Sequence, residues 1–294
     1  FVVENDKTPT VAYSIALNIH PGLEGEAAGL AAITSDLITS GTKNRSKDQL
    51  DNDIDFIGAK LSATTSGIFA SALSQQHKNL VELLADVLLN PDFKQEELDK
   101  LKKQTLSQLA QEKDDPDAIS KNVEAVLNFG KNHPYGELTR EETLSKITLD
   151  KCNEYFKTYF RPNVAYLAVV GDVKLIDVKS LLEKHLGSWQ RADVPSFVPP
   201  MPAAPEKTRV AFVNKPGAVQ SVVTVTYPVE LKPNSEDLTK SKVLNTILGG
   251  GFSSRLFMNL REKHGFTYGS YSTLTNDELV GQFSAYAKVR NAVS

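Results

Sequence analysis

Apolar and polar positions follow regular patterns along the first part of the chain, and the patterns predict a mixture of strands and helices. Residues 10–20 (TVAYSIALNIH) and 163–173 (NVAYLAVVGDV) read as strands, and two shorter strands flank Gly67. The predicted helices cover residues 24–40, 46–58, 79–89, 94–113, 114–130 and 175–187. Strands and helices in such mixed order indicate an α+β fold.

The same order of elements begins again after a proline-rich stretch. Residues 191–207 (RADVPSFVPPMPAAPEK) hold five prolines and little periodicity, so they read as an interdomain linker. The elements predicted beyond it are strands 208–214 (TRVAFVN) and 220–229, helices 235–251 and 253–265, and strands 266–275 and 279–289. One strand, two helices and two paired strands therefore occur in both halves, which suggests duplication of one α+β unit.

These patterns define the domains that we expect. The first spans residues 1–190, the linker residues 191–207, and the second begins at residues 208–294. Since the opening residues FVVEN already read as a strand, we expect a chain trimmed of a leader or otherwise cut. The last residues stop just after a strand pattern, so we expect the second domain to be incomplete.

Composition limits the classes of function. A chain of 294 residues exceeds what one hydrophobic core usually organises, which agrees with two domains. Thirty-three basic residues nearly balance 36 acidic ones, and no basic block stands out, so we expect no nucleic-acid partner. The longest apolar runs, such as residues 164–170, are too short for a transmembrane helix. The single cysteine, Cys152, lies in a helical apolar pattern and reads as a half-buried thiol.

The predicted helix after the first long strand carries the positions where a catalytic metal would be expected. In residues 29–42 (GLAAITSDLITSGT), positions 32 and 36 lie one turn apart, where two imidazoles could hold zinc. The residues present are Ala32, Ser35 and Asp36. A methyl group coordinates nothing, and one carboxylate beside a hydroxyl does not make a tight zinc site.

This stretch resembles the zinc-binding segment of the M16 peptidases, the family of insulin-degrading enzyme, pitrilysin and the mitochondrial processing peptidase. In that family an H-x-x-E-H motif lies between Gly-Leu-Ala and Gly-Thr, which are present here at residues 29–31 and 41–42. Further matching motifs follow in order: TKNRS (42–46), IGAKLSATTS (57–66), LLADVLLNPDF (83–93), HPYG (133–136) and NVAYLAVVGDV (163–173). The resemblance implies the M16/LuxS-like metallohydrolase fold, with two related domains that each have a largely antiparallel sheet and helices on one face.

The resemblance also implies that the metal site is degenerate. The family's first zinc histidine falls at Ala32, its catalytic glutamate at Ser35 and its second histidine at Asp36. The third ligand, a glutamate on the long downstream helix, falls within one residue of Gln108. We therefore expect no zinc in this chain and expect a homologous partner chain to carry it.

A second stretch resembles the family's substrate-contacting segment. In residues 245–272, Arg261 and Tyr268 have the seven-residue spacing of an arginine and a tyrosine that contact the peptide across from the zinc. Such donors hold substrate carbonyls and help only if a metal-bound water comes from elsewhere. Without the resemblance, Arg261 would read as a surface residue pairing with Glu262 or Asp277, and Tyr268 as a half-buried strand residue.

Two shorter motifs leave alternatives open. The loop formed by Gly249, Gly250 and Gly251 resembles a family loop that can touch substrate, and it equally fits a helix end with a tight turn. The tripeptide NRS at Asn44 fits a glycosylation sequon, a match that is common by chance.

Together these observations predict a non-catalytic, substrate-binding subunit of a heterodimeric M16-type zinc metallopeptidase. Its partners would be a homologous zinc-bearing chain and an unfolded peptide held partly by strand addition. The alternatives are a structural subunit similar to the core proteins of the respiratory cytochrome bc1 complex, and a stand-alone peptide-binding protein. One cysteine and a trimmed start suit a bacterial periplasm or envelope, with the mitochondrial matrix as the alternative.

Overall fold

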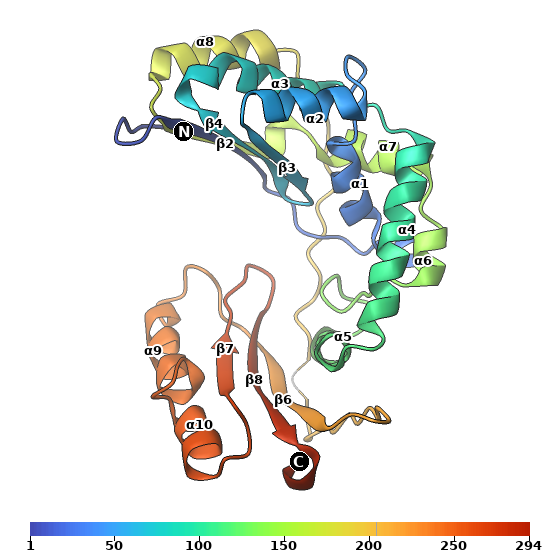
Figure 1. The fold of residues 1–294 in the computed structure, drawn as a ribbon, viewed down its shortest axis with the longest axis vertical. Coiled ribbons are helices and arrows are strands. Elements are labelled where there is room, and N and C mark those ends of the chain that lie inside the picture. Colours follow the sequence, from blue (N-terminus) through green and yellow to red (C-terminus); the bar gives the residue numbers. More distant parts are fainter. Residues whose placement is uncertain (204) are drawn as a thin grey trace. The chain divides into compact units, whose positions relative to one another are not determined.

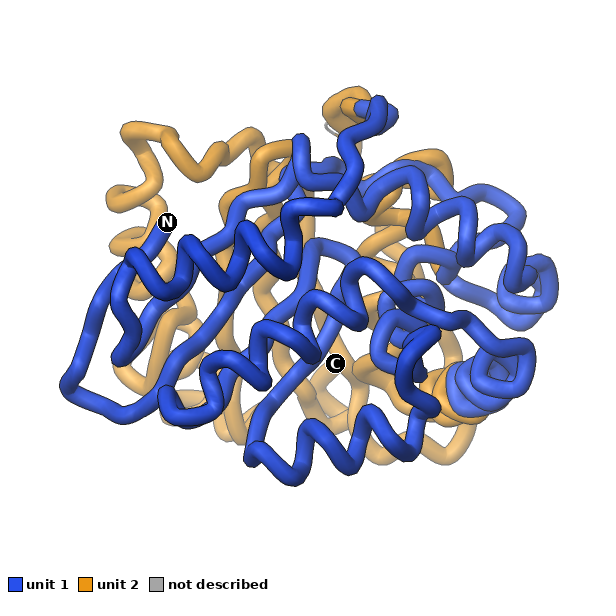
Figure 2. Tube along the Cα trace, turned by 90° about the horizontal axis from the view of Figure 1, so that it is seen from above, with its two compact units in different colours: residues 1–106, 139–197 blue, residues 107–138, 198–294 orange. Residues whose placement is uncertain are grey.

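The chain forms two compact units in a computed structural model that describes residues 1–203 and 205–294. Residue 204, which belongs to the predicted linker, lies outside the described residues. The first unit contains residues 1–106 and 139–197, and the second contains residues 107–138 and 198–294 (Figure 2). These ranges differ from the predicted domains at residues 107–138. This segment joins the second unit because its helix hydrogen-bonds to the first strand of that unit, as described below.

A five-stranded sheet organises the first unit, with the strand order β1-β5-β2-β4-β3. The strands are Val2–Glu4 (β1), Thr10–Leu17 (β2), Lys60–Thr64 (β3), Gly67–Leu73 (β4) and Ala165–Gly171 (β5). The β1–β5 pair is parallel and the other pairs are antiparallel. In β2, Val11, Tyr13 and Ile15 are buried while the residues between them are more exposed, so one face of the sheet forms the core.

The helices of this unit are Leu30–Ile38 (α1), Lys47–Phe56 (α2), His77–Leu89 (α3), Glu141–Ser145 (α6), Leu149–Tyr159 (α7) and Leu175–Leu186 (α8), together with most of Gln95–Glu112 (α4). The last residues of α4, 107–112, belong to the second unit. Helices α2, α3 and α8 lie over the strands (Figure 1), and α3 buries Leu80, Val81 and Leu84 completely. The predicted helix at 24–40 is divided into a 3-10 turn, Gly25–Ala27, and α1, because Gly29 between them has φ 102°.

The second unit repeats the strand pairing of the first. Its three-stranded antiparallel sheet has the order β6-β8-β7, which corresponds to the β2-β4-β3 part of the other sheet. The elements are Pro116–Phe129 (α5), Gln220–Val229 (β6), Leu238–Gly249 (α9), Arg255–Phe257 (α10), a π-helical turn at Met258–Lys263, Ser270–Leu274 (β7), Gly281–Arg290 (β8) and a 3-10 turn at Asn291–Val293. The prediction of an α+β fold with two related halves is therefore confirmed.

The two faces of the second sheet differ in polarity. Thr224 and Thr226 of β6 point toward α5, where they hydrogen-bond to Ser120 (3.0 Å) and Asn128 (2.6 Å). The alternate residue Tyr227 lies on the opposite face and stacks on the Phe283 ring with a centroid distance of 4.9 Å. The polar face of this sheet therefore holds α5, and the apolar face lies on the side of α9.

The predicted strand at 208–214 is wrong. Val210 and Phe212 are 88% and 86% exposed, and the segment has no strand assignment. Alternation of apolar residues suits a strand but does not supply the backbone hydrogen-bonding partner that a strand also requires. Within the described residues, no helix combines the length and the apolar character needed to cross a bilayer.

Candidate functional site

Helix α1 carries three of the predicted site positions, and Glu24 fixes where that helix begins. The Glu24 carboxylate accepts hydrogen bonds from the backbone N–H groups of Gly29 (2.6 Å), Leu30 (2.9 Å) and Ala31 (2.8 Å). These donors have no partner within the helix, and a negative charge at a helix N-terminus is stabilising. The Glu24 carboxylate therefore already satisfies the N–H donors and the partial positive charge at the start of α1.

The donor set on α1 does not fit zinc. Ala32 and Asp36 lie one turn apart on an exposed strip of the helix, whereas Ser35 is buried and donates its hydroxyl to the carbonyl of Ala31 at 2.8 Å. Although its side chain reaches the surface, the surrounding protein partly desolvates the Asp36 carboxyl and raises its pKa above the ordinary value, which disfavours the ionised form that a metal would need. A methyl group, an engaged hydroxyl and one such carboxyl supply no imidazole and no second charged ligand.

The fourth predicted metal position also lacks a suitable donor. Gln108 is exposed on α4 and donates its amide Nε2 to Glu112 Oε1 at 3.0 Å. A neutral amide is a weak ligand for zinc beside histidine or carboxylate. Across residues 1–203 and 205–294, no three His, Cys, Asp or Glu side chains gather in an arrangement that could hold a metal ion.

Next to α1, the TKNRS loop is tied to a buried carboxylate that the sequence analysis did not single out. Asp86 on α3 accepts hydrogen bonds from Thr42, Asn44 and Arg45 of this loop and from Asn90. Asn44, the asparagine of the NRS tripeptide, uses its amide nitrogen in this contact. The position of Asp86 inside the otherwise apolar run from Leu83 to Leu89 was the signal that could have revealed this network.

Arg261 lies on the π-helical turn of the second unit. Its Nε is 3.6 Å from Glu262 Oε1, and its guanidinium carbon lies 4.9 Å from the centroid of the Phe257 ring. The Arg261 and Glu262 side chains are 42% and 52% exposed, so their ion pair contributes under about 1 kcal/mol. The pairing expected of an ordinary surface arginine is therefore present, yet it is weak enough for a ligand to replace. Turns of π-helix occur frequently at functional sites.

Tyr268 lies in the loop between this turn and β7. Its side chain is 86% exposed, which excludes the alternative of a half-buried strand tyrosine. The loop around it is held by Thr267, whose hydroxyl accepts from Gly269 N and donates to Gly269 O. The side chains of Arg261 and Tyr268 are both exposed to solvent. Among the described residues, no hydrogen bond joins them.

The three glycines of the predicted loop have different surroundings. A Cβ added at Gly249 would lie 2.3 Å from Ser272 N, and one at Gly250 would lie 2.6 Å from Thr246 Cα. A Cβ at Gly251 would meet nothing within 4 Å. Gly249 is therefore needed for the close approach of α9 to β7, a contact reinforced by hydrogen bonds between Asn245 and Ser272. Of the three glycines, Gly251 alone has open space beside it.

Gly249→Ala is expected to destabilise the protein by about 1–3 kcal/mol, because the added methyl must displace backbone atoms of β7. The matched variant Gly251→Ala should change the stability by less than about 0.5 kcal/mol, since the position is open. Urea unfolding followed by circular dichroism measures both effects. Equal stability of the two variants would show that Gly249 is not a packing residue.

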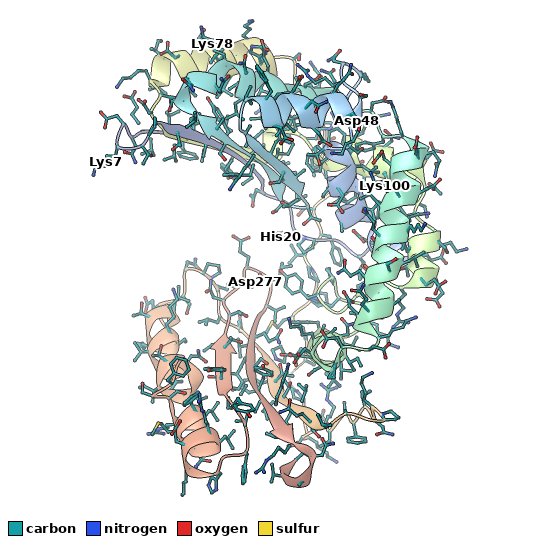
Figure 3. All side chains as sticks on the ribbon, viewed as in Figure 1. Lys7, His20, Asp48, Lys78, Lys100 and Asp277 are labelled. Carbon is teal, nitrogen blue, oxygen red and sulfur yellow. The ribbon has the colours of Figure 1, made fainter. Side chains whose placement is uncertain are left out.

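A cluster missed by the sequence analysis anchors the β7–β8 loop, where Asp277 lies (Figure 3). Asp277 Oδ1 accepts from the Tyr135 hydroxyl (2.9 Å) and from the backbone of Leu279 (2.8 Å) and Val280 (3.2 Å). Burial and the bond to Asp277 raise the pKa of the Tyr135 hydroxyl. Tyr135 belongs to the HPYG motif, so this motif has a structural partner 142 residues away.

Family profiles cover nearly the whole chain. The profile described as "Insulinase (Peptidase family M16)" matches residues 1–134. The profile described as "Peptidase M16 inactive domain" matches residues 146–293. The boundary between the two profiles does not coincide with that between the two units, because the second profile already matches residues 146–197 of the first unit.

Individual relatives give the same result. The chain is 29% identical over 89% of its length to an "Uncharacterized zinc protease" of Rickettsia felis, of which it spans 64%. It is 27% identical over 97% of its length to the "Uncharacterized zinc protease YmxG" of Bacillus subtilis, of which it spans 70%. It is also 27% identical over 83% of its length to the "Non-peptidase homolog YmxG" of Helicobacter pylori, of which it spans 57%. The chain thus spans about two thirds of the length of these relatives.

Solved structures share the fold. A "peptidase M16 inactive domain" from Pseudomonas fluorescens superimposes with a TM-score of 0.89 at 23% identity, over 98% of this chain and 71% of the other. A "protease from Helicobacter pylori" gives a TM-score of 0.87 at 21% identity, over 99% of this chain and 72% of the other. Because two family profiles in the expected order cover the chain and the fold agrees, this protein belongs to the M16 peptidase family.

Proposed function

We propose that the chain is a non-catalytic, substrate-binding subunit of a two-chain zinc metallopeptidase. One observation carries the proposal: α1 offers a methyl group, an engaged hydroxyl and a single carboxyl where the reaction would need metal ligands and a base. Hydrolysis by this chain alone would therefore lack both the metal and the group that activates water. In this proposal a homologous partner holds the zinc.

The contribution of this chain would be to hold the peptide. Arg261 and Tyr268 keep exposed donor groups on one segment, and the Glu262 pairing of Arg261 is weak. A guanidinium and a phenol can donate hydrogen bonds to peptide carbonyls and to an oxyanion that develops on one of them. These donors would act on the carbonyl while the partner's site supplies the attacking group.

Strand β7 offers a second means of holding an extended peptide. It is an edge strand of the β6-β8-β7 sheet and follows directly after the Arg261–Tyr268 segment. Edge strands expose backbone N–H and C=O groups that an extended peptide can pair with. Gly251, which has open space beside it, would allow a peptide to approach the end of α9. Backbone pairing of this kind suits an unfolded substrate because it depends little on side chains.

Co-purification from the native host tests the proposal. Starting from separated periplasmic and cytoplasmic fractions, we expect the chain to be recovered from the periplasm with a homologous subunit that contains an intact H-x-x-E-H motif. The bacterial relatives named above favour a bacterial compartment over the mitochondrial matrix, and the periplasm is the compartment that we propose. Metal analysis should find zinc in the partner and in no stoichiometric amount in this chain. Cleavage of an unfolded fluorogenic peptide should require both chains.

Other outcomes would favour the alternatives. Peptide affinity of the isolated chain, without any stimulation of a partner's cleavage, would support a stand-alone peptide-binding protein. Assembly into a complex that neither binds nor cleaves peptides would support a structural subunit. Turnover by the isolated chain would contradict all three.

A further inference from the structure

A hollow of about 460 Å3 lies on the surface of the first unit, beside α7. This volume falls within the range of small-molecule sites in proteins. Its charged lining comes from Asp150, Glu154 and Lys157 of α7, from Arg161 just beyond that helix, and from Asp193 of the linker. None of the five belongs to the degenerate metal site or to the Arg261–Tyr268 segment.

The charges of α7 are arranged in an unusual order along its exposed face. Asp150 and Glu154 are four residues apart, so these like charges occupy neighbouring positions on successive turns, and Lys157 and Arg161 follow them at and beyond the end of the helix. Like charges at this spacing disfavour the helix, whereas opposite charges would support it. Within the described part of the chain, none of these four side chains, nor Asp193, forms an ion pair. The hollow therefore has a negative end at Asp150 and Glu154 and a positive end at Lys157 and Arg161, and these side chains form no ion pair among the described residues.

Arg161 has an unmet hydrogen-bonding group at the positive end. Its Nη1 donates to the carbonyl of Gln190 at 3.3 Å, but its buried Nε has no partner among the described residues. Arg161 is part of the lining of the hollow, and carboxylates are the acceptors that a guanidinium binds most strongly. The positive end is therefore suited to a carboxylate.

The linker wall of the hollow is held in place by the body of the unit. The Trp189 indole donates to the Phe160 carbonyl at 3.1 Å, and Ala192 N donates to Asn163 Oδ1 at 3.3 Å. With the Arg161–Gln190 bond, three contacts fix the chain just before Asp193. The hollow is thus formed by anchored segments, and Asp193 adds a further negative charge to its wall.

We propose that this hollow binds a short peptide with free termini, whose ammonium group lies toward Asp150 and Glu154 and whose carboxylate lies toward Lys157 and Arg161. The seven residues from Asp150 to Lys157 correspond to a helical rise of about 10 Å. An extended peptide of three residues spans about 10 Å, so its two charged ends match the two ends of the hollow. A zwitterion also brings an opposite charge to each end of the hollow at once. This site is additional to the proposed peptidase role and does not depend on it.

Triglycine is a suitable probe because it presents only a backbone and two charged termini. In NMR titrations of the 15N-labelled protein, we expect saturable binding that shifts the side-chain Nε–H signal of Arg161 and the amides of α7. Acetylating the amino end or amidating the carboxyl end should each weaken binding about tenfold or more, because each removes a charge-assisted hydrogen bond.

Two exposed charges provide the variants, and a third residue of the same helix provides the control. Glu154→Gln and Lys157→Gln should each weaken triglycine binding about tenfold. Lys151→Gln should leave it unchanged, because Lys151 also lies on α7 but is not part of the hollow and donates to the Lys146 carbonyl. The proposal is overturned if no binding saturates up to about 10 mM. It is equally overturned if end-blocked triglycine binds as well as triglycine, or if Lys151→Gln weakens binding as much as the other two variants.

Discussion

Replacing Asp86 with alanine is expected to lower the free energy of unfolding by about 3–5 kcal/mol. Asp86 is only 5% exposed, and its carboxylate accepts from Thr42 Oγ1 (2.7 Å), Asn44 Nδ2 (2.5 Å), Arg45 Nη1 (2.6 Å) and Asn90 Nδ2 (3.1 Å). Alanine would leave these donors, one of them charged, without an acceptor in a poorly hydrated place. The only tryptophan of the chain, Trp189, packs against the core of the same unit. Its fluorescence during urea unfolding therefore reports on the unfolding of the first unit, which contains Asp86.

Asp53 provides the matched control. It pairs with the same arginine, Arg45 Nε to Asp53 Oδ2 at 2.8 Å, but its side chain is 52% exposed. Asp53→Ala should therefore cost less than about 1 kcal/mol. If the Asp53 and Asp86 variants lost equal stability, burial of the Asp86 network would not be the cause.

The Asp86 network also predicts how stability depends on pH. Burial by itself raises the pKa of this carboxyl, but the hydrogen bonds from Thr42, Asn44, Arg45 and Asn90 outweigh it and hold the pKa below its usual value. A group whose pKa is lowered in the folded state stabilises the fold fully at pH values above its pKa in the unfolded state, which is about 4 for an aspartate. The contribution is lost as the pH falls through the lower folded pKa. The stability difference between Asp86→Asn and the parent protein should therefore shrink on acidification below about pH 4.

Arg261→Ala is expected to lower kcat/KM of the reconstituted two-chain peptidase by about 100-fold or more, while binding to the partner is retained. The expectation follows from the proposed role, because removing one donor to a developing oxyanion typically costs about 100- to 1,000-fold in rate. Arg261 is 42% exposed and its pairing with Glu262 is weak, so its loss should change stability by less than about 0.5 kcal/mol. A loss of activity without unfolding would separate a role in substrate binding from a structural one.

Lys263→Ala is the control for this experiment. Lys263 lies on the same π-helical turn and is also exposed, but it does not have the spacing to Tyr268 that suggested the site. Its replacement should leave kcat/KM nearly unchanged. Arg261→Lys should recover little activity if the guanidinium holds a carbonyl with two N–H groups, since an ammonium cannot reproduce that geometry. Full activity of Arg261→Ala would contradict the assigned role of the residue.

Several secondary-structure elements and one chemical property of the site were predictable from the amino-acid sequence alone. The spacing of apolar positions predicted β2, α3 and α4 with their approximate ends, because core packing imposes a period of two on strands and 3.6 on helices. The repeated order of strand, two helices and two strands predicted two related halves, and the structure shows the corresponding strand orders β2-β4-β3 and β6-β8-β7. The missing ligand at position 32 also needed no coordinates, since the Ala32 side chain has no donor atom and cannot bind a metal in any conformation.

The tertiary structure decided which residues become partners. Asp86 and Thr42 are 44 residues apart, Tyr135 and Asp277 are 142 apart, and no local pattern links them. Residues 107–138 join the second unit because Ser120 and Asn128 meet the threonines of β6. The strand predicted at 208–214 is absent because alternation records which side chains are apolar but not whether a neighbouring backbone is available.

For the candidate site residues, too, the sequence supplied one part of the picture and the fold supplied the other. Sequence alone placed Arg261 and Tyr268 seven residues apart, but the exposure of both side chains and the weakness of the Arg261–Glu262 pair depend on the fold. Likewise, the three glycines are identical in the sequence, and only the approach of β7 to α9 distinguishes the packed Gly249 from the open Gly251. The sequence by itself determined the local periods and the chemical groups present. The tertiary structure determined their burial and their contacts, because both depend on segments that are distant along the chain and meet only on folding.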